Sequence, residues 1–403
     1  MIEVRKADEL VRLFSLKLST ELVKLEDLYG RVLSKEIRAT RMQPPFDRVT
    51  MDGIAIQFDQ LLGKKFNICG IQKAGSPPLF LEDNNHALEV MTGAVLPMNS
   101  DTVIPYEHLV INDGRAQIRP GIDIEQGQNI HFEGSDYLAG KILFEAGHRI
   151  NSASLAVIAS QGITHAEVLK YPQIAIVSTG DELVESGKPC EPWQIWRSNS
   201  IAIQAELRAF GVPEKNIKMV HLVDDKNLIF STLAELLNHC DTFIISGGVS
   251  MGKYDFVQSV MNDLGVEEVF YKVQQRPGKP MFFGKNKDSK IVFGLPGNPV
   301  SALICMRRYV IQSLCYSFKM SRDSRLVKLS EDIVFKKDLT LFKAVNIENQ
   351  ADGSKVARAI DSNGSGDFYS LGLGDGFIEL PAEQNVHKAG ALFPFYSWSG
   401  LNL

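Results

Sequence analysis

The sequence has few cysteines, and they form no recognisable motif. Five cysteines are spread along 403 residues, and they are odd in number, widely separated and without a CxxC pair. This distribution argues against a disulfide framework and against a zinc site. We therefore expect reduced thiols, as in a cytoplasmic protein.

Long hydrophobic runs and an excess of positive charge are also lacking. No apolar stretch approaches the roughly 20 residues of a membrane-spanning helix, and the amino-terminal residues do not resemble a signal peptide. The 43 Lys and Arg residues face 48 Asp and Glu residues, so there is no overall basic footprint for nucleic acid. We expect a cytoplasmic protein that binds neither membrane nor nucleic acid and holds any anionic ligand by local charges.

The length implies several domains, because 403 residues exceed what one ordinary hydrophobic core spans. Helical patterns occur at 7–14 and 25–33, and paired prolines predict irregular structure over 42–56. Short apolar alternations broken by glycine, proline and asparagine over 65–150 indicate a β-rich domain, and 152–162 returns to a helical pattern.

Strand-like and helix-like segments alternate between 174 and 314, which predicts a parallel sheet covered by helices. After residue 321 the pattern returns to short strands. The fold class is therefore multi-domain α/β, with a central three-layer α/β domain, two β-rich domains and an amino-terminal helical and linker region. We expect the linker region at 1–60 and 146–172, the first β-rich domain at 61–145, the α/β domain at 173–322 and a barrel-like domain at 323–403.

The segment GLPGNPVSAL at 294–303 places loop formers directly before a helical pattern. Asn298 can cap this helix and Pro299 can occupy its first position, which leaves open amides for an anion. Upstream, the pattern of SGGVSMGKYD at 246–255 predicts a glycine-rich turn after a buried strand. In open α/β sheets, ligands bind at that edge.

Carboxylates follow several of the predicted strands. Asp181 and Glu182 lie in STGDEL, Asp224 and Asp225 follow 219–223, and Asp255 ends the glycine-rich turn. Any one of them would more often cap a helix or fill a turn. Several on one edge of the sheet instead favour a metal on a phosphate ligand, because Mg²⁺ prefers a few carboxylates together with phosphate oxygens.

Basic residues gather around a Pro-Gly turn in YKVQQRPGKP, at 271–280. Lys272, Arg276 and Lys279 could hold an oxyanion, but an ordinary solvated hairpin explains the charges equally well. Asp52, in an Asp-Gly turn, and Ser365 are each more often structural in such contexts. The local sequence suggests neither a Ser/His/Asp nor a Cys/His arrangement.

Taken in order, these motifs resemble one family. PPFDRVTMDGIAI, MTGAVLP, STGDEL, SNS, SGGVSMGKYD, PGKP, GLPGNPVSA and NGSG resemble those of the molybdopterin molybdotransferases of the MoeA type, also found as the E domain of gephyrin. The resemblance runs along the whole chain. It implies a molybdopterin-binding type of central domain, an elongated four-domain subunit and a homodimer with a shared active site. The implied reaction inserts molybdate into adenylylated molybdopterin with Mg²⁺ and releases AMP.

The resemblance also assigns residues. As catalytic residues it implies Asp52, Thr92, Asp136, Glu182, Asp224 and Asp255. The first three would come from the partner subunit, and the last three would hold the metal. The implied substrate-binding residues are Ser178, Gly180, Asn199, Gly247, Gly248, Ser250, Gly252, Lys272, Arg276, Pro277, Lys279, Pro296, Gly297, Asn298, Lys343 and Ser365. Of these, Lys272, Arg276, Lys343 and Ser365 match the molybdate pocket of the family.

The chain departs from the family pattern at four positions. Arg197 stands where the family usually has aspartate, Arg276 replaces a lysine, Lys343 replaces an arginine and His131 replaces an arginine. These departures, Arg197 above all, support one alternative, a non-catalytic molybdopterin-binding paralogue. The other alternative is a molybdopterin adenylyltransferase, the activity that the resemblance implies for single-domain relatives of the central domain. A molybdopterin adenylyltransferase and apo-molybdoenzymes are the protein partners that the resemblance implies.

Overall fold

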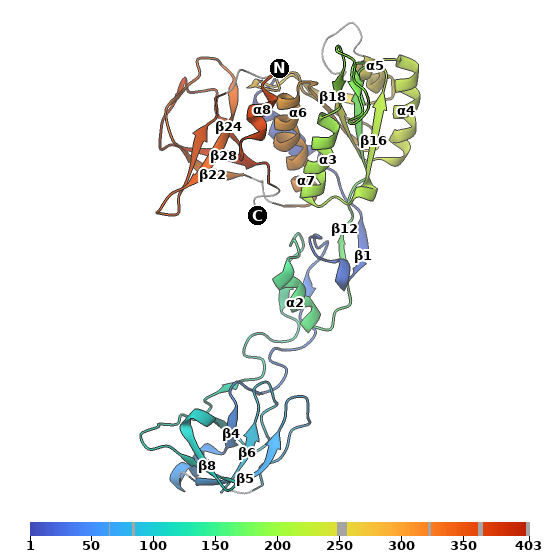
Figure 1. Ribbon diagram of the computed structural model, residues 1–403. Coiled ribbons are helices and arrows are strands. Elements are labelled where there is room, and N and C mark those ends of the chain that lie inside the picture. The colour runs from blue at the N-terminus through green and yellow to red at the C-terminus, as the bar shows by residue number, and fades with distance from the viewer. Residues whose placement is uncertain (64, 83–84, 248–255, 321–323, 362–365, 400–403) are drawn as a thin grey trace. The chain divides into compact units, whose positions relative to one another are not determined.

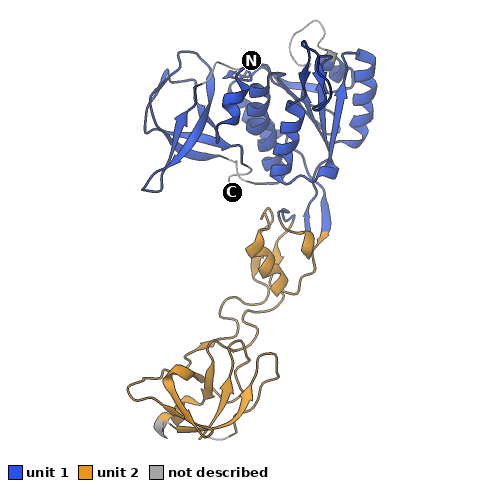
Figure 2. Ribbon diagram, viewed as in Figure 1, with its two compact units in different colours: residues 1–22, 30–34, 167–403 blue, residues 23–29, 35–166 orange. Residues whose placement is uncertain are grey.

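The computed structural model describes residues 1–403 except 64, 83–84, 248–255, 321–323, 362–365 and 400–403. The chain forms two compact units, which Figure 2 shows in different colours. Unit 1 comprises residues 1–22, 30–34 and 167–403, and unit 2 comprises residues 23–29 and 35–166. None of the helices in the described parts of the chain is long and apolar enough to cross a membrane.

Unit 1 is built on a six-stranded sheet (Figure 1). In spatial order its strands are β16 (Ile217–Leu222), β13 (Ile174–Thr179), β17 (Thr242–Ser246), β21 (Ile291–Leu295), β20 (Phe282–Lys285) and β18 (Glu267–Tyr271). The prediction of a fully parallel sheet is wrong at one strand, because β20 runs against both of its neighbours. This strand has only four residues, and the alternation pattern does not separate it from the basic turn before it.

Helices cover both faces of this sheet, which confirms the three-layer α/β prediction. Successive strand residues point to opposite faces. Accordingly, Ile176 of β13 packs in one core cluster with α3 (Asn199–Phe210), whereas Val177 packs in another with α4 (Lys226–His239). The α3 face also carries α1 (Val4–Leu13), α6 (Pro299–Cys305) and α7 (Ile311–Ser317), and the α4 face carries α5 (Phe256–Asp263). A π-helical turn, η5 (Met306–Val310), joins α6 to α7.

The carboxy-terminal part of unit 1 is a closed ring of five strands around its own apolar core. These strands are β22 (Arg325–Leu329), β24 (Thr340–Asn349), β25 (Lys355–Ala359), β26 (Gly376–Leu380) and β28 (Leu392–Ser397). The ring closes because β24 pairs with both β25 and β26. Shorter elements complete this part: β23 (Ile333–Val334) pairs with β27 (Val386–His387), and α8 (Phe368–Gly372) precedes β26.

Unit 2 contains a second six-stranded sheet, in line with the predicted β-rich region. Its strands, in spatial order, are β7 (Thr102–Pro105), β4 (Gly53–Ile56), β6 (His86–Val90), β5 (Lys65–Gln72), β9 (Arg115–Ile118) and β8 (Leu109–Asn112). Two short pairs join β10 (Ile130–His131) to β3 (Arg48–Val49) and β11 (Ile142–Phe144) to β2 (Ile37–Arg38). Elsewhere, β1 (Thr20–Lys24) pairs with β12 (His165–Leu169), and the predicted helix is α2 (Ser152–Ser160), which Asn151 caps.

Two local predictions in the first sixty residues are wrong. The helix expected over 25–33 is only a single 3₁₀ turn, Leu25–Asp27, because the chain reverses through Gly30 at φ 75°. The stretch expected to be irregular over 42–56 contains β3 and β4. The paired prolines lie upstream of these strands, and the buried side chains of Val49 and Ile54 draw the chain into the core of unit 2.

Candidate functional site

Four loops meet at one edge of the central sheet because the strands before them run in parallel register. Ser178 of β13 pairs with Ser246 of β17, which pairs with Leu295 of β21. The loops that follow these strands, and the one after β16, therefore leave the sheet side by side. This is the edge at which open α/β sheets bind ligands.

A cavity of about 140 Å³, here called the rim cavity, opens between these loops. The predicted residues that line it are Ser178, Glu182, Asn199, Gly247 and Gly297. Gly180, Pro296 and Asn298 are neighbours of lining residues in the chain but do not line it. Asn298 instead caps α6 by accepting a hydrogen bond from Ser301 N at 3.1 Å, as predicted.

Asn199 ties three elements of the rim cavity together. From the first turn of α3, its Nδ2 donates to Ser246 Oγ at 2.8 Å and to the carbonyl of Gly297 at 2.9 Å. At Gly247, φ is 91° and a Cβ would lie 2.8 Å from the carbonyl oxygen of Thr179. Only glycine fits there, so the glycine-rich turn begins with its backbone close against the end of β13.

Carboxylates crowd one side of the rim cavity. The backbone N–H of Asp224 donates to Asp181 Oδ1 at 3.1 Å. Burial, and then the charges of Asp181 and Glu182, raise the pKa of Asp224. Asp225 has a structural role, since it caps α4 by accepting from Leu228 N at 2.9 Å. The charges of Asp181 and Glu182 thus act against ionisation of Asp224, and a bound cation would offset that repulsion.

The described residues fit Mg²⁺ only together with a phosphate ligand. No group of three or more His, Cys, Asp or Glu side chains is placed to hold a metal within the described ranges. The predicted ligand Asp255 and the predicted residues Gly248, Ser250 and Gly252 lie outside those ranges. The pair Glu182 and Asp224 matches the one or two carboxylates that Mg²⁺ takes when phosphates and waters supply the remaining oxygens.

Sequence reasoning missed His221, which lies beside the rim cavity. Its Nδ1 lies 3.1 Å from Ser178 Oγ. Burial, and then the charge of Arg197, lower the pKa of His221, so this ring is neutral at pH 7. Arg197 itself lines the cavity, next to the exposed Trp196. No local motif marks His221, because only the register of β16 with β13 brings it to Ser178.

A second cavity of about 330 Å³, here called the barrel cavity, adjoins the first turn of α6. Pro299 lines the rim cavity and Val300 lines the barrel cavity, so the two flank the same turn. Two predicted cations, Arg276 and Lys343, line the barrel cavity together with Pro277. They are adjacent because β19 (Gln275–Arg276) pairs in parallel with β24.

The other predicted members of the molybdate pocket are placed differently. Lys272 does not line the barrel cavity, and its Nζ lies 4.9 Å from the ring centroid of Tyr271. Lys279 is in the same loop but also does not line it, and Ser365 lies outside the described residues. Asp367 faces the cavity instead, where its carboxylate caps α8 by accepting from Ser370 N at 3.1 Å.

Unit 2 holds the remaining predicted residues in two hydrogen-bonded groups. Asp52 Oδ1 accepts from Thr92 N at 2.6 Å and from Thr92 Oγ1 at 2.7 Å, and these bonds lower the pKa of Asp52. His131 Nε2 lies 2.8 Å from Asp136 Oδ1, while its Nδ1 lies 3.0 Å from a guanidinium nitrogen of Arg48. Arg48 thus supplies a permanent charge beside His131, the position where the family usually has arginine.

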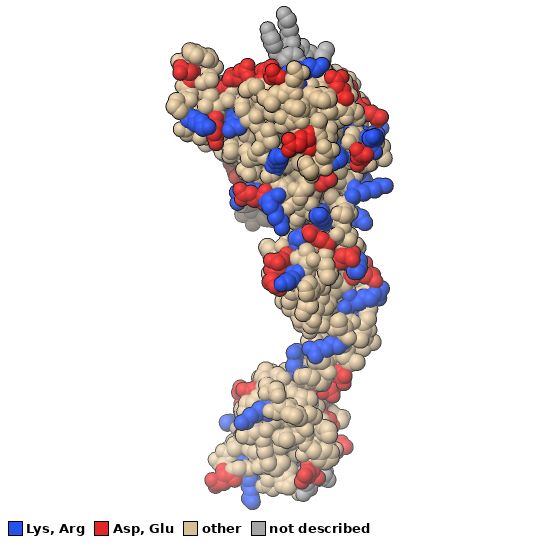
Figure 3. Space-filling view, turned by 90° about the vertical axis from the view of Figure 1, so that its right-hand side faces the viewer, with Lys and Arg blue, Asp and Glu red and all other residues tan. Residues whose placement is uncertain are grey.

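Figure 3 shows one face of the molecule coloured by charge. On this face the described Lys and Arg side chains are interspersed with Asp and Glu, and neither sign forms a continuous patch.

Three family models match consecutive parts of the chain. "MoeA N-terminal region (domain I and II)" matches residues 2–162, "Probable molybdopterin binding domain" matches 175–315, and "MoeA C-terminal region (domain IV)" matches 327–398. The central sheet and its rim cavity thus belong to the class of molybdopterin-binding-type α/β domains.

Individual relatives extend this match to the full length. A protein of Synechocystis sp. named molybdopterin molybdenumtransferase is 38% identical over 401 residues, which are 99% of this chain and 100% of the relative. A protein of the same name from Haemophilus influenzae is 32% identical over 72% of this chain and 71% of its own length. The crystal structure of a molybdopterin biosynthesis MoeA protein from Pyrococcus horikoshii matches 98% of this chain and all of its own, with a TM-score of 0.82 and 26% identity. The chain belongs to the MoeA family.

Proposed function

We propose that this protein is a molybdopterin molybdenumtransferase, which joins molybdate to adenylylated molybdopterin and releases AMP. The observation that carries the proposal is the pair of cavities on either side of the first turn of α6. One is lined by Glu182 and Gly247, and the other is lined by two cations, Arg276 and Lys343, together with Asp367. The reaction needs both, because it breaks a phosphoanhydride and binds a tetrahedral dianion.

The rim cavity would hold the phosphates of the substrate. Ser178, Asn199 and the backbone at Gly247 offer hydrogen-bonding groups at the end of the parallel strands. Glu182 and Asp224 would hold Mg²⁺, with Asp255 as a further ligand. When bound, Mg²⁺ neutralises charge on the phosphate oxygens. Water then adds across the phosphoanhydride, so that AMP leaves and the other phosphate stays on molybdopterin.

The barrel cavity would hold molybdate. Arg276 and Lys343 would bind the two negative charges of the ion, while the carboxylate of Asp367, which also lines the cavity, is engaged in capping α8. The planar guanidinium of Arg276 can donate two parallel hydrogen bonds, whereas Lys343 acts as a point charge. As the two dithiolene sulfurs of molybdopterin bind molybdenum, one oxygen of molybdate would leave as water with the two thiol protons, without a change of oxidation state. Lys272 and Ser365 are proposed as further members of this pocket.

The quaternary structure and the surroundings of the protein are part of the proposal. We propose a cytoplasmic homodimer in which Asp52, Thr92 and Asp136 of one subunit complete the site of the other. The hydrogen bonds that keep Asp52 ionised support a role for its charge. We keep the four-domain division predicted from the sequence. A molybdopterin adenylyltransferase would supply the substrate, and apo-molybdoenzymes would receive the product.

The alternative functions are not favoured. A molybdopterin adenylyltransferase would need the central domain alone. It would not account for residues 2–162 and 327–398, which match the MoeA N-terminal and C-terminal regions. A non-catalytic paralogue would rest on Arg197, which lines the rim cavity but leaves the predicted carboxylates beside it in place.

The test is AMP release from adenylylated molybdopterin with Mg²⁺, measured with and without molybdate. We expect release that depends on molybdate and a product that activates an apo-molybdoenzyme. Binding of the substrate without release would overturn the proposal. Arg197→Asp, which restores the residue usual in the family, is the matched variant, and recovery of release in it would locate the loss at that position.

A further inference from the structure

The loop that carries Arg276 is held by one buried side-chain amide, that of Gln275. Gln275 is 1% exposed, and its Nε2 donates to the carbonyl oxygens of Pro277 at 3.2 Å and Gly278 at 3.0 Å. Gly278 has no room for a side chain, since a Cβ there would lie 2.7 Å from this same Nε2. The side chain of Gln275, just before Arg276, is thus bonded to the backbone just after it, which closes the turn that carries Arg276.

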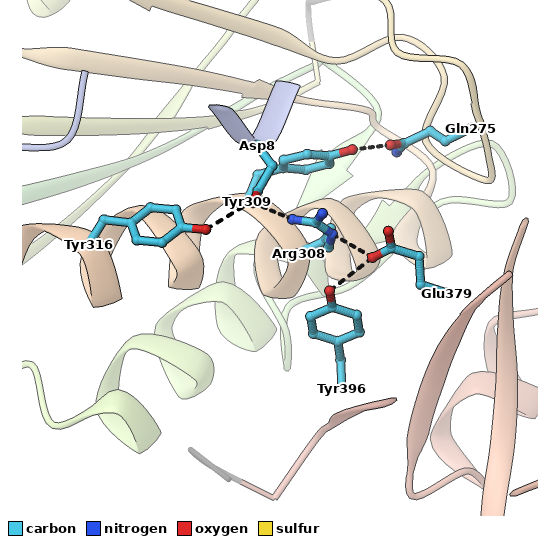
Figure 4. A network of polar contacts seen from close by, with 7 residues as sticks. All are labelled: Asp8, Gln275, Arg308, Tyr309, Tyr316, Glu379 and Tyr396. Carbon is cyan, nitrogen blue, oxygen red and sulfur yellow. Dashed lines mark hydrogen bonds and ion pairs between the residues drawn. The ribbon is translucent and has the colours of Figure 1, made fainter. Parts of the chain in front are cut away.

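The other end of this amide is held by a tyrosine. Gln275 Oε1 accepts a hydrogen bond from the hydroxyl of Tyr309, which is fully buried on η5 (Figure 4). Burial raises the pKa of Tyr309 well above its usual range, so the hydroxyl stays protonated and can donate. Because an amide oxygen only accepts and its nitrogen only donates, the two carbonyls and the phenol fix one orientation of Gln275.

Arg308, the residue before Tyr309 on η5, contacts the strand that pairs with β24, which carries Lys343. Arg308 is 1% exposed, and its Nε donates to Glu379 Oε2 at 2.8 Å, which also accepts from Tyr396 at 2.9 Å. Glu379 pairs directly with Phe342, the residue before Lys343 on β24. Figure 4 shows both arms of this network leaving the same helical turn.

We propose that Tyr309 and Gln275 are positioning residues that set the place of Arg276 relative to Lys343, and so the affinity of the barrel cavity for a tetrahedral oxyanion. The inference rests on the function proposed above for that cavity. Neither residue lines the cavity. Both act through Arg276, because a cation displaced from its bound position loses its directed hydrogen bonds to the ion.

The test compares two tyrosines of the same network. Tyr309→Phe removes the hydroxyl that holds Gln275, whereas Tyr316→Phe removes a hydroxyl that donates to Asp8 Oδ2 at 3.1 Å, away from the loop. In Tyr309→Phe we expect roughly tenfold weaker molybdate binding by calorimetry and a KM for molybdate raised by about the same factor. The kcat at saturating molybdate and the KM for adenylylated molybdopterin should not change. Tyr316→Phe should keep wild-type molybdate affinity.

Hydrogen exchange gives a readout that does not depend on activity. The amides of Val273 and Met281 both donate to the carbonyl of Lys279 at 3.0 Å, so their protection reports on the loop. We expect faster exchange over 272–281 in Tyr309→Phe and not in Tyr316→Phe. Equal exchange and equal molybdate affinity in the two variants would overturn the positioning role. A wild-type protein that binds no molybdate would instead overturn the proposed function, while the exchange data would still show whether Tyr309 holds the loop.

Discussion

The rim cavity and the barrel cavity share one helical turn but are built in different ways. The rim cavity is lined by Ser178, Gly247 and Gly297, which lie at or just beyond the ends of parallel strands, and by the first turn of α3. The barrel cavity combines the loop before β20 with α6, β24 and α8, which are far apart in the sequence. Their charges differ as well, with crowded carboxylates beside one and Arg276 and Lys343 in the other.

The difference teaches how each site depends on its surroundings. Parallel strand ends meet at one edge of the sheet, so the strand register itself places most of the rim cavity, and Asn199 then joins α3 to the strand ends. The barrel cavity brings two cations together. Because like charges repel, buried contacts must hold the segments that carry Arg276 and Lys343 in place. Changes in the buried network should therefore affect the barrel cavity most.

The largest expected effect is on stability, through Arg308. Arg308→Met leaves Glu379 and Asp8 without the guanidinium that both contact, so we expect unit 1 to lose about 3–5 kcal/mol of unfolding free energy. Urea denaturation followed by tryptophan fluorescence measures this, because all three tryptophans, at 193, 196 and 398, lie in unit 1. Arg358→Met removes an exposed ion pair with Glu348, which water and salt screen, so the unfolding free energy should fall far less than in Arg308→Met. Equal losses would contradict the network.

The second effect is on molybdate binding. Lys343→Glu changes the charge of the barrel cavity by two units, so we expect the KM for molybdate to rise about a hundredfold, equivalent to roughly 2.7 kcal/mol. Lys355→Glu makes the same change on β25, away from the cavity, and should leave that KM within about twofold of wild type. Steady-state kinetics of AMP release separate the two, and a matching rise in both would mean that general charge governs binding.

The third effect concerns the rim cavity. Gly247→Ala combines an unfavourable φ of 91° with a contact of 2.8 Å to the carbonyl of Thr179. We therefore expect the unfolding free energy to fall by about 2 kcal/mol. Gly187→Ala has nearly the same φ, 89°, but open space around the new methyl group, and should cost about 1 kcal/mol. Only Gly247→Ala should also weaken binding of adenylylated molybdopterin. Calorimetry of that substrate decides the point, and unchanged affinity would remove Gly247 from the site.

The smallest effect is a pH dependence at Asp224. Burial, and then the charges of Asp181 and Glu182, raise its pKa in the folded protein above the usual aspartate value of about 3.8, so its ionised form is less favourable in the fold than in the unfolded chain. Asp224 therefore lowers the free energy of unfolding as pH rises from about 3.8, its pKa in the unfolded chain, through its higher pKa in the fold. Asp224→Asn removes this penalty. Because the side chain is exposed, we expect the variant to be more stable at pH 7 by only about 0.3 kcal/mol.

Urea curves at several pH values check the sign of this effect. The gain in Asp224→Asn should vanish below about pH 3.8, where both side chains are neutral. Added Mg²⁺ should stabilise the wild-type protein more than the variant. A variant that is less stable at pH 7 would show that Asp224 makes favourable contacts that outweigh the repulsion.

Much of the central domain could be predicted from local patterns. The runs at 174–178 and 242–246 are continuous and apolar, as buried parallel strands require, and both form strands. The cap at Asn298 and the proline after it also form as predicted. The 25–33 segment was mispredicted because helical spacing alone does not show that Gly30 reverses the chain.

The sequence by itself determined the order of the motifs, the family and the elements whose side-chain period is local. Such features depend on neighbours a few residues apart, which the chain displays directly. Only the tertiary structure decided that His221 meets Ser178, that Arg276 and Lys343 line one cavity, and that one turn of η5 contacts both the segment that carries Arg276 and the strand paired with β24. These contacts join residues tens of positions apart, and strand register and burial select them because no local pattern encodes which distant segments pair.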